Sequence, residues 1–396
     1  MAAYAPGNER QKRLYLAIVF LYWASLYFYV PTLPVYTQAR VESLAMVGTV
    51  LAMYGLWQAV LRLPLGIVAD WLGRRKPFIL SGLVFSAAGA VIMAHAGSAG
   101  GMVAGRAVTG LAAASWVPLV VIYTGLFPPA EMVRAAAMLT LVNSASRMFA
   151  TALNGTLNAA GGYPLAFFVS AAVAATAVLL LLPVREPSRA IHAPTVDSIV
   201  RLVTRRDVLL PSLLSAVAQY ATWATVFSFI PILARLYGAS DVLQGILVSM
   251  NIGVVALGNV ITAAVVKRVG KRSLLYLSFL ILALGVFAVA TGRSLLFVVL
   301  AQFFIGLSTG INYPILMGMS IEHVDESQRA TAMGVYQSVY AIGMFTGPWL
   351  SGLMADAMGI HAMFLLTGVV LLVLGLSGSY WLDQPVRYSS CKRSPG

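Results

Sequence analysis

The stretch Gly66-Ile-Val-Ala-Asp70-Trp-Leu-Gly73-Arg74-Arg75-Lys76 lies between two long apolar runs of the chain. Gly66 has no Cβ, so another helix can approach the chain closely at this point. Gly73 permits the sharp turn that reverses the chain within a few residues. Three consecutive basic residues follow, and such residues collect on one side of membrane proteins. The stretch therefore predicts a short basic loop between two helices that cross a membrane.

The composition of the whole chain agrees with a membrane protein. Of the 396 residues, 60% are hydrophobic and 10% are charged, whereas soluble domains carry roughly 25% charged residues. With 26 Lys and Arg and 13 Asp and Glu residues, the chain cannot cover the surface of a soluble protein. The single cysteine, Cys391, and four scattered histidines exclude a disulfide framework and a cysteine-based zinc site. We expect neither a cofactor nor a metal site.

Twelve apolar runs are long enough to cross a bilayer, which takes about 20 mainly apolar residues. The first run is too long for the core of a signal peptide, so we expect it to be retained as a helix. A polar stretch separates six runs from six. We therefore predict an all-α membrane protein with twelve transmembrane helices. The runs lie near 14–37, 44–66, 77–97, 102–126, 135–159, 164–183, 208–234, 242–266, 273–292, 295–320, 330–355 and 362–382.

The basic residues indicate how the chain is oriented. Twenty of the 26 Lys and Arg residues fall in the tails and in alternate loops on one side of the predicted helices. Basic residues favour the cytoplasmic side, so both termini are predicted to be cytoplasmic in a multi-pass protein of a bacterial-type plasma (inner) membrane. The net charge of +13 is thus explained by topology, and we expect no nucleic-acid partner.

The two blocks of six runs resemble each other. Arg134-Ala-Ala-Ala-Met138 opens the fifth run, and Arg329-Ala-Thr-Ala-Met333 opens the eleventh. This repeat predicts two pseudo-symmetric six-helix bundles related by an axis along the membrane normal, with any shared pathway between them. We predict an N-terminal bundle over 1–183, a cytoplasmic linker over 184–207, a C-terminal bundle over 208–383 and a cytoplasmic tail over 384–396.

Prolines and glycines predict bends and close contacts. Pro31 and Pro34 in the first run and Pro231 in the seventh interrupt backbone hydrogen bonds at equivalent points of the two halves. Small residues in the eleventh run predict a seam at which neighbouring helices pack closely. They are Gly343, Gly347 and Gly352, next to Pro348.

The stretch from Gly66 to Lys76 resembles the signature loop of the major facilitator superfamily, Gly-x-x-x-Asp-x-x-Gly-Arg-Arg/Lys. The length, the twelve runs, the basic linker and the repeated halves fit that family as well, so the resemblance covers essentially the whole chain. It implies the fold of that family, with two six-helix bundles that work by alternating access.

The resemblance also implies that Asp70 faces the eleventh helix, which begins at Arg329. A carboxylate beside the N-terminus of a helix is stabilised by the helix dipole. We predict that Asp70 forms a latch that closes the cytoplasmic side; the alternative is a solvated turn. In the second half Lys267 stands where Asp70 would fall, so control is expected to be asymmetric. The residues expected to couple the conformations are Gly66, Asp70, Gly73, Arg74 and Arg329.

Three arginines, Arg62, Arg106 and Arg147, lie inside predicted helices, whereas the acids lie in tails, loops or helix ends. Charges inside a membrane are costly and mark candidate functional sites. Arg106 and Gly110 resemble the Arg-x-x-x-Gly part of a pattern found in proton-coupled antiporters of the family. The alternative for each arginine is a side chain that extends to the interface or binds backbone carbonyls between helices.

Aromatic and amide side chains accompany these arginines in the predicted helices. Such a wall suits an amphipathic organic ligand, although the same side chains also hold helices together. The predicted substrate-binding residues are Tyr27, Arg106, Trp116, Asn143, Arg147, Gln219, Tyr220, Trp223, Asn251, Asn312, Tyr336, Gln337 and Tyr340.

These observations predict a secondary active transporter of a small organic solute and not an enzyme. We favour proton-coupled export of a drug or metabolite, with the proton inferred from the family resemblance; the alternative is uptake of a sugar or an organic anion. A membrane-embedded enzyme or receptor is disfavoured, because the sequence offers no buried acid–base pair, no metal cluster and no sizeable soluble domain. The expected partners are the small-molecule substrate, protons and the lipid bilayer, and the expected state is a monomer.

Overall fold

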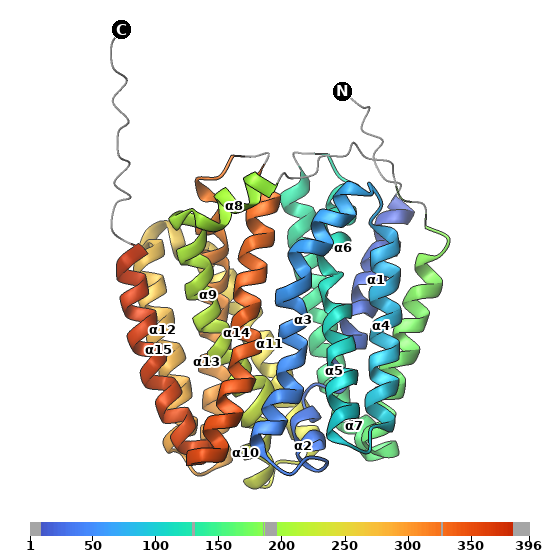
Figure 1. Ribbon diagram of the computed structural model, residues 1–396. Coiled ribbons are helices and arrows are strands. Elements are labelled where there is room, and N and C mark those ends of the chain that lie inside the picture. Colours follow the sequence, from blue (N-terminus) through green and yellow to red (C-terminus); the bar gives the residue numbers. More distant parts are fainter. Residues whose placement is uncertain (1–8, 129–130, 185, 187–195, 326–327, 383–396) are drawn as a thin grey trace.

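The structure is a computed structural model that describes residues 9–128, 131–184, 186, 196–325 and 328–382. These residues are almost entirely helical and contain no strand (Figure 1). Long apolar runs form the helices because a bilayer leaves backbone N–H and C=O groups no partner outside the helix itself. The predicted all-α membrane fold is therefore confirmed.

The first half of the chain forms a bundle on one side of Figure 1, coloured blue to green. Its helices are α1 (Glu9–Tyr27), α2 (Leu33–Gln38), α3 (Leu44–Trp71), α4 (Lys76–His95), α5 (Ala99–Ala114), α6 (Trp116–Thr124) and α7 (Met132–Leu181).

The second half forms the bundle coloured green to red. Its helices are α8 (Val196–Thr204), α9 (Arg206–Ala224), the π-helix η2 (Thr225–Phe229), α10 (Ile230–Leu236), α11 (Asp241–Val269), α12 (Lys271–Thr291), α13 (Leu295–Glu322), α14 (Arg329–Met358) and α15 (Ile360–Leu382).

The twelve predicted spans all appear, although several are divided or joined. The first consists of α1 and α2, the fourth of α5 and α6, and the seventh of α9, η2 and α10. The fifth and sixth are joined in α7, which leaves helical geometry at Gly161 and Gly162. Within the described residues, nine helical stretches are long and apolar enough to cross a membrane by length and composition alone. Helices α1 and α14 are not among the nine, because α1 is shortened by its break and α14 carries many small and polar residues. Helix α7 contains two spans but counts as one stretch.

The predicted bends are confirmed in both halves. Helix α1 ends at Tyr27, and the chain restarts as α2 with Pro34 in its first turn. In the second half a π-helical segment precedes Pro231, which opens α10. Proline lacks the N–H that a continuous helix needs, so each span breaks at the same relative height.

The predicted small-residue seam of α14 is also confirmed. A Cβ added at Gly343 or Gly347 would overlap backbone atoms of α9. One added at Gly352 would lie 2.7 Å from the backbone oxygen of Leu44, at the start of α3. Helix α14 therefore packs tightly on its own bundle and, at its last turns, on the first bundle. The domain limits at 183, 207 and 383 stay a prediction, and the tail 384–396 lies outside the described residues.

The two ends of the molecule differ in charge. The loop from α3 to α4 and the linker helix α8 lie at the end drawn uppermost in Figure 1, which we call the basic end after Arg74, Arg75, Lys76 and Arg201. The short helices α2 and α10 lie at the opposite end.

The bundles meet tightly at the opposite end. A Cβ at Gly48 would overlap the backbone oxygen of Pro348, and one at Gly155 would overlap backbone atoms of Val242. At the basic end, by contrast, a Cβ at Gly66 would meet one described atom within 4 Å, a Val117 methyl carbon at 3.8 Å in the same bundle. The bundles therefore pack backbone against backbone at the opposite end, whereas the basic end leaves space beside Gly66.

Polar contacts reinforce the packing at the opposite end. The backbone N–H of Leu44 donates to Oδ1 of Asp356 at 2.8 Å, which joins the start of α3 to the end of α14. Asn158 Nδ2 in α7 donates to Oδ2 of Asp241 at 2.9 Å, at the start of α11. Two carboxylates of the second bundle thus hold two helices of the first.

Candidate functional site

A central cavity of about 190 Å³ lies between the two bundles. Helices α1, α3, α6 and α7 of the first bundle and α9, α11, α13 and α14 of the second contribute to its wall, together with η2. It lies where both halves can contact one ligand, as expected for a shared pathway between repeats.

Eight of the thirteen predicted substrate-binding residues line this central cavity. Their side chains come from both bundles and combine one cation with amides and aromatic rings. They are Tyr27, Trp116, Asn143, Arg147, Gln219, Trp223, Asn251 and Tyr340.

Arg106 does not line the central cavity. It is 2% exposed, and its guanidinium carbon lies 4.2 Å from the centroid of the Tyr54 ring. Its Nε and Nη1 have no hydrogen-bond partner among the described residues. The arginine is therefore packed between α5 and α3, with its charge against a ring face, a favourable arrangement for a desolvated guanidinium.

Three other predicted residues contact neighbouring side chains instead of the cavity. The Tyr220 hydroxyl lies 3.2 Å from Ser351 Oγ, and the Tyr336 hydroxyl 2.8 Å from Ser215 Oγ, so both join α9 to α14. Asn312 is 2% exposed and donates to Ser308 Oγ one turn earlier at 3.3 Å. The two tyrosine contacts match the helix-joining alternative for polar side chains in membranes, whereas the Asn312 contact lies within α13.

The central cavity also contains residues outside the predicted set, among them Trp23, Tyr54, Arg62 and Tyr313. Arg62 could have been selected from the sequence, because it is a charged residue inside an apolar run. Tyr54 could have been found from spacing: Tyr54, Gln58 and Arg62 are four residues apart and share one helix face.

Arg62 connects the two bundles at the cavity wall. It is 4% exposed, its Nη1 donates to the Tyr340 hydroxyl, and its Nη2 donates to Gln58 Oε1. Its Nε has no hydrogen-bond partner among the described residues. Neither contact neutralises the charge, so Arg62 retains the capacity to bind an anion.

Arg147 is the second cation of the central cavity. Its guanidinium carbon lies 4.4 Å from the ring centroid of Tyr27 and 5.9 Å from that of Trp23. The Nε of Arg147 and the Oδ1 of Asn143, one turn away, are buried without a hydrogen-bond partner among the described residues. Aromatic faces stabilise the cation, while its unused donors remain available to a ligand.

A second cavity, of about 290 Å³, lies toward the basic end, and we call it the basic-end cavity. Arg62 lines this cavity as well as the central one, and Gln337, the remaining predicted residue apart from those above, lies in its wall. Apolar side chains form much of that wall. They include Leu63, Ile67, Val117, Val120, Val121 and Met333.

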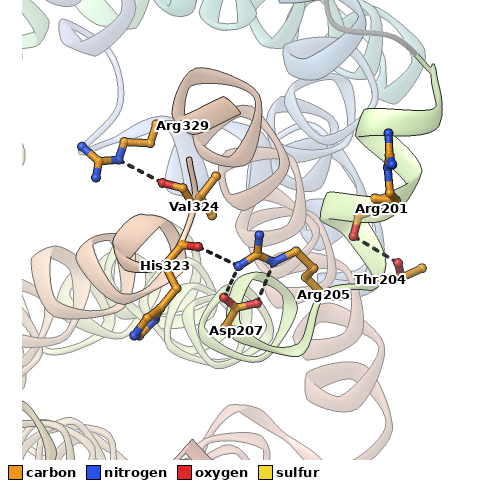
Figure 2. Close-up of polar contacts among 7 residues, drawn as sticks. All are labelled: Arg201, Thr204, Arg205, Asp207, His323, Val324 and Arg329. Atoms are coloured by element: carbon orange, nitrogen blue, oxygen red, sulfur yellow. Dashed lines mark hydrogen bonds and ion pairs between the residues drawn. The ribbon is translucent and has the colours of Figure 1, made fainter. Parts of the chain in front are cut away.

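Three of the five predicted coupling residues, Gly66, Asp70 and Arg329, line the basic-end cavity, and Gly73 and Arg74 do not. Asp70, in the last turn of α3, forms an ion pair with Arg75. Arg329 Nε donates to the backbone oxygen of Val324 at 3.2 Å (Figure 2). Gly73 takes a φ of +60°, the left-handed conformation that a sharp turn requires. In this conformation Asp70 thus pairs with Arg75, and Arg329 contacts the loop before α14.

The linker is anchored beside the same cavity. Arg205 contacts both carboxylate oxygens of Asp207, at 3.0 and 2.6 Å, and donates to the backbone oxygen of His323 at 2.8 Å (Figure 2). Leu202 of α8 is buried in a cluster with Val208, Val324 and Val335. The corner between α8 and α9 is therefore fixed to the second bundle, next to the start of α14.

Comparison with known proteins points to one family along the whole chain. The sequence profile described as Major Facilitator Superfamily matches residues 15–216 and 212–395. The inner membrane transport protein YajR of Escherichia coli (strain K12) is 26% identical over 401 residues, which cover 98% of this chain and 86% of YajR.

A shorter match and a solved structure agree with this result. The proton-coupled antiporter flippase LtaA of Staphylococcus haemolyticus is 24% identical over 183 residues, 45% of each chain. The crystal structure of a bacterial homolog to the human lysosomal transporter Spinster, in an inward-facing and unoccupied conformation, superimposes with a TM-score of 0.80. It is 17% identical and covers 95% of this chain and 97% of its own, so it supports the fold.

Proposed function

The chain belongs to the major facilitator superfamily, and from this premise we propose that it is a secondary active transporter that moves a small organic anion by alternating access. As a member of that family it is a multi-pass membrane transporter. The chemical class of the substrate, the direction of transport and the coupling ion belong to the proposal.

One observation carries the choice of an anion: Arg62 and Arg147 line the central cavity, and no Asp or Glu is among its described lining residues. A buried charge without a counter-ion is costly, and a ligand that supplies the opposite charge relieves that cost. Trp23, Tyr27 and Trp223 offer ring faces, and Asn143 and Gln219 offer amides. The ligand that fits this wall has one anionic group on an aromatic or otherwise apolar body.

For direction we propose proton-coupled export across the plasma (inner) membrane, with the basic end and both termini in the cytoplasm. The distribution of basic residues supports this orientation. The Arg106-x-x-x-Gly110 pattern and the similarity to a proton-coupled antiporter support the coupling. Uptake of a sugar or an organic anion is the alternative. Arg62 and Arg147 favour the organic anion for either direction.

Binding of benzoate and benzamide to the purified protein tests the choice of an anion, because the two ligands have similar shape and differ in charge. We expect benzoate to bind and benzamide to bind at least about tenfold more weakly, since charge-assisted hydrogen bonds are about twice as strong as neutral ones. Arg147→Gln should abolish this preference. Arg293→Gln, an exposed arginine at the opposite end, should retain it. Equal binding of the two ligands to the wild-type protein would disprove the proposal.

Proteoliposomes with an acidic interior distinguish the two directions of coupling. Benzenesulfonate is the appropriate probe, because it stays charged and does not leak through lipid as a neutral acid. An antiporter moves its substrate in the direction opposite to the protons. Because protons leave the acidic interior, the anion should accumulate inside, on the acidic side. Accumulation on the alkaline side would instead indicate proton symport and the uptake alternative.

A further inference from the structure

The two cavities meet at Arg62, whose side chain lines both. The central cavity is also lined by Arg147, Asn143 and aromatic rings. The basic-end cavity is also lined by Leu63 and Ile67 of α3 and Val117 and Val121 of α6. The wall is therefore cationic and aromatic on one side of Arg62 and largely apolar on the other.

The size of the cavities matters for what they hold. Organic ligands occupy pockets of about 300–1,000 Å³, whereas the central cavity has about 190 Å³. The basic-end cavity adds about 290 Å³, so that only the two together reach the usual range. A ligand of ordinary size whose charged group lies at Arg147 must extend into the apolar part.

Both bundles contribute to the apolar part. Val117 and Val121 belong to the first bundle, and Met333 and Gly334 belong to the start of α14 in the second. A Cβ at Gly334 would lie 3.2 Å from Leu63 Cδ1, so the two bundles pack against each other at this point of the wall. The ion pair of Asp70 with Arg75 also lines this cavity, so its wall carries charge beside its apolar side chains.

We propose that the substrate is an amphipathic anion whose charged group binds Arg62 and Arg147 and whose hydrocarbon chain lies in the basic-end cavity. Because it needs an anion at Arg147, this inference rests on the proposed function. It names a narrower class of substrate: an organic acid with a flexible or extended apolar chain, not a compact polar anion such as a sugar phosphate. In the competing explanation the apolar wall serves only to seal the basic end when the bundles close.

A series of straight-chain carboxylates from butanoate to decanoate tests the inference on the purified full-length protein in nanodiscs. Burying a methylene group strengthens binding roughly two- to fourfold, so the affinity of the wild-type protein should rise by about that factor with each added methylene. An affinity that does not change with chain length would overturn the inference and favour the explanation that the apolar wall only seals the basic end.

A matched pair of variants separates binding in the cavity from partition of the carboxylates into lipid. Val117→Thr combined with Val121→Thr keeps the side-chain shape but makes the cavity wall polar, so the gain per methylene should fall well below twofold while butanoate binds as before. Val68→Thr, at an exposed position on α3 outside the cavity lining, should keep the wild-type gain. An unchanged gain in the double variant would overturn the inference.

Arg147→Gln distinguishes failure of this inference from failure of the proposed function. If butanoate and benzoate bind the wild-type protein and lose affinity in Arg147→Gln, but chain length has no effect, the chain site is wrong and the anion site stands. If neither carboxylate depends on Arg147, both are wrong.

Discussion

Oδ1 of Asp356, in the last turn of α14, accepts a 2.8 Å hydrogen bond from the backbone N–H of Leu44, the first residue of α3. The first N–H groups of a helix have no partner within the helix, and the helix dipole favours a negative charge beside them. A carboxylate of one bundle thus caps a helix of the other. This contact lies at the end where the bundles pack backbone against backbone, and it mirrors the predicted role of Asp70 at the basic end.

Asp356→Asn should weaken closure at the opposite end. Replacing the carboxylate by an amide removes a charge–dipole contribution of about 0.3–1 kcal/mol, which shifts the balance of conformations two- to fivefold toward the form open at that end. Spin labels at the exposed positions Met46 and Met358, in a Cys391→Ser background, would report a larger fraction of long distances. Asp325→Asn, an exposed acid at the basic end, should leave the distances unchanged. Identical distributions in Asp356→Asn would contradict the role of this contact.

Gly155→Ala should disturb the other contact between the bundles. Its Cβ would overlap backbone atoms at Val242, and backbone cannot move aside as a flexible side chain can. We expect faster amide hydrogen exchange in the first turns of α11, because that end of the interface must open. Gly97→Ala is the control, since a Cβ at Gly97 meets no described atom within 4 Å. The prediction fails if both variants exchange like the wild-type protein.

Asp70→Asn should slow transport of benzenesulfonate. In the conformation closed at the basic end, Asp70 is predicted to face the N-terminus of α14, where a carboxylate contributes about 0.3–1 kcal/mol and up to about 2 kcal/mol when partly buried. The rate should therefore fall at least twofold. Glu322→Gln, which removes an exposed ion pair with Lys271 at the same end, should change the rate little. An unchanged rate in Asp70→Asn would leave the solvated-turn alternative.

Tyr340→Phe should make the thermal stability of the protein depend more strongly on bound ligand. The Tyr340 hydroxyl is the partner of Arg62 Nη1, and a buried donor left without a partner costs about 1–3 kcal/mol. The unfolding temperature of the variant without ligand should fall. Saturating benzoate should raise the unfolding temperature of the variant by more than it raises that of the wild-type protein, because the anion replaces the lost acceptor. Tyr220→Phe loses a hydroxyl contact away from the cavity and should show no extra recovery. Equal benzoate shifts in all three proteins would refute this role of Arg62.

The fold was predictable to a large extent because its main signals are local. Runs of apolar residues set the helices, and Pro231 marked the break of the seventh span. The turn within α7, at Gly161 and Gly162, falls between the predicted runs 135–159 and 164–183. The limits that differed, such as the separation of α5 from α6 within the fourth span, depend on turns within a span and not on hydropathy.

The site was less predictable because rotation of each helix about its axis is set by packing partners. Arg106 and Arg147 are the same residue type in neighbouring spans, yet one lies against Tyr54 between helices and the other lines the central cavity. Tyr220 and Trp223 are three residues apart on α9, and only Trp223 reaches the cavity. The contact of Asp70 also depends on conformation. An alternating-access transporter adopts at least two conformations, and the structure shows one of them.

Transport of labelled benzenesulfonate by proteoliposomes containing the wild-type protein or Arg147→Gln tests the anion pathway most directly, with unlabelled benzenesulfonate and benzenesulfonamide as competitors. We predict that the wild-type protein transports the anion, that the anion competes at least about tenfold better than the neutral amide, and that Arg147→Gln loses both the transport and the preference. Transport by Arg147→Gln at the wild-type rate, or equal competition by the two compounds, would contradict an anion pathway through the central cavity.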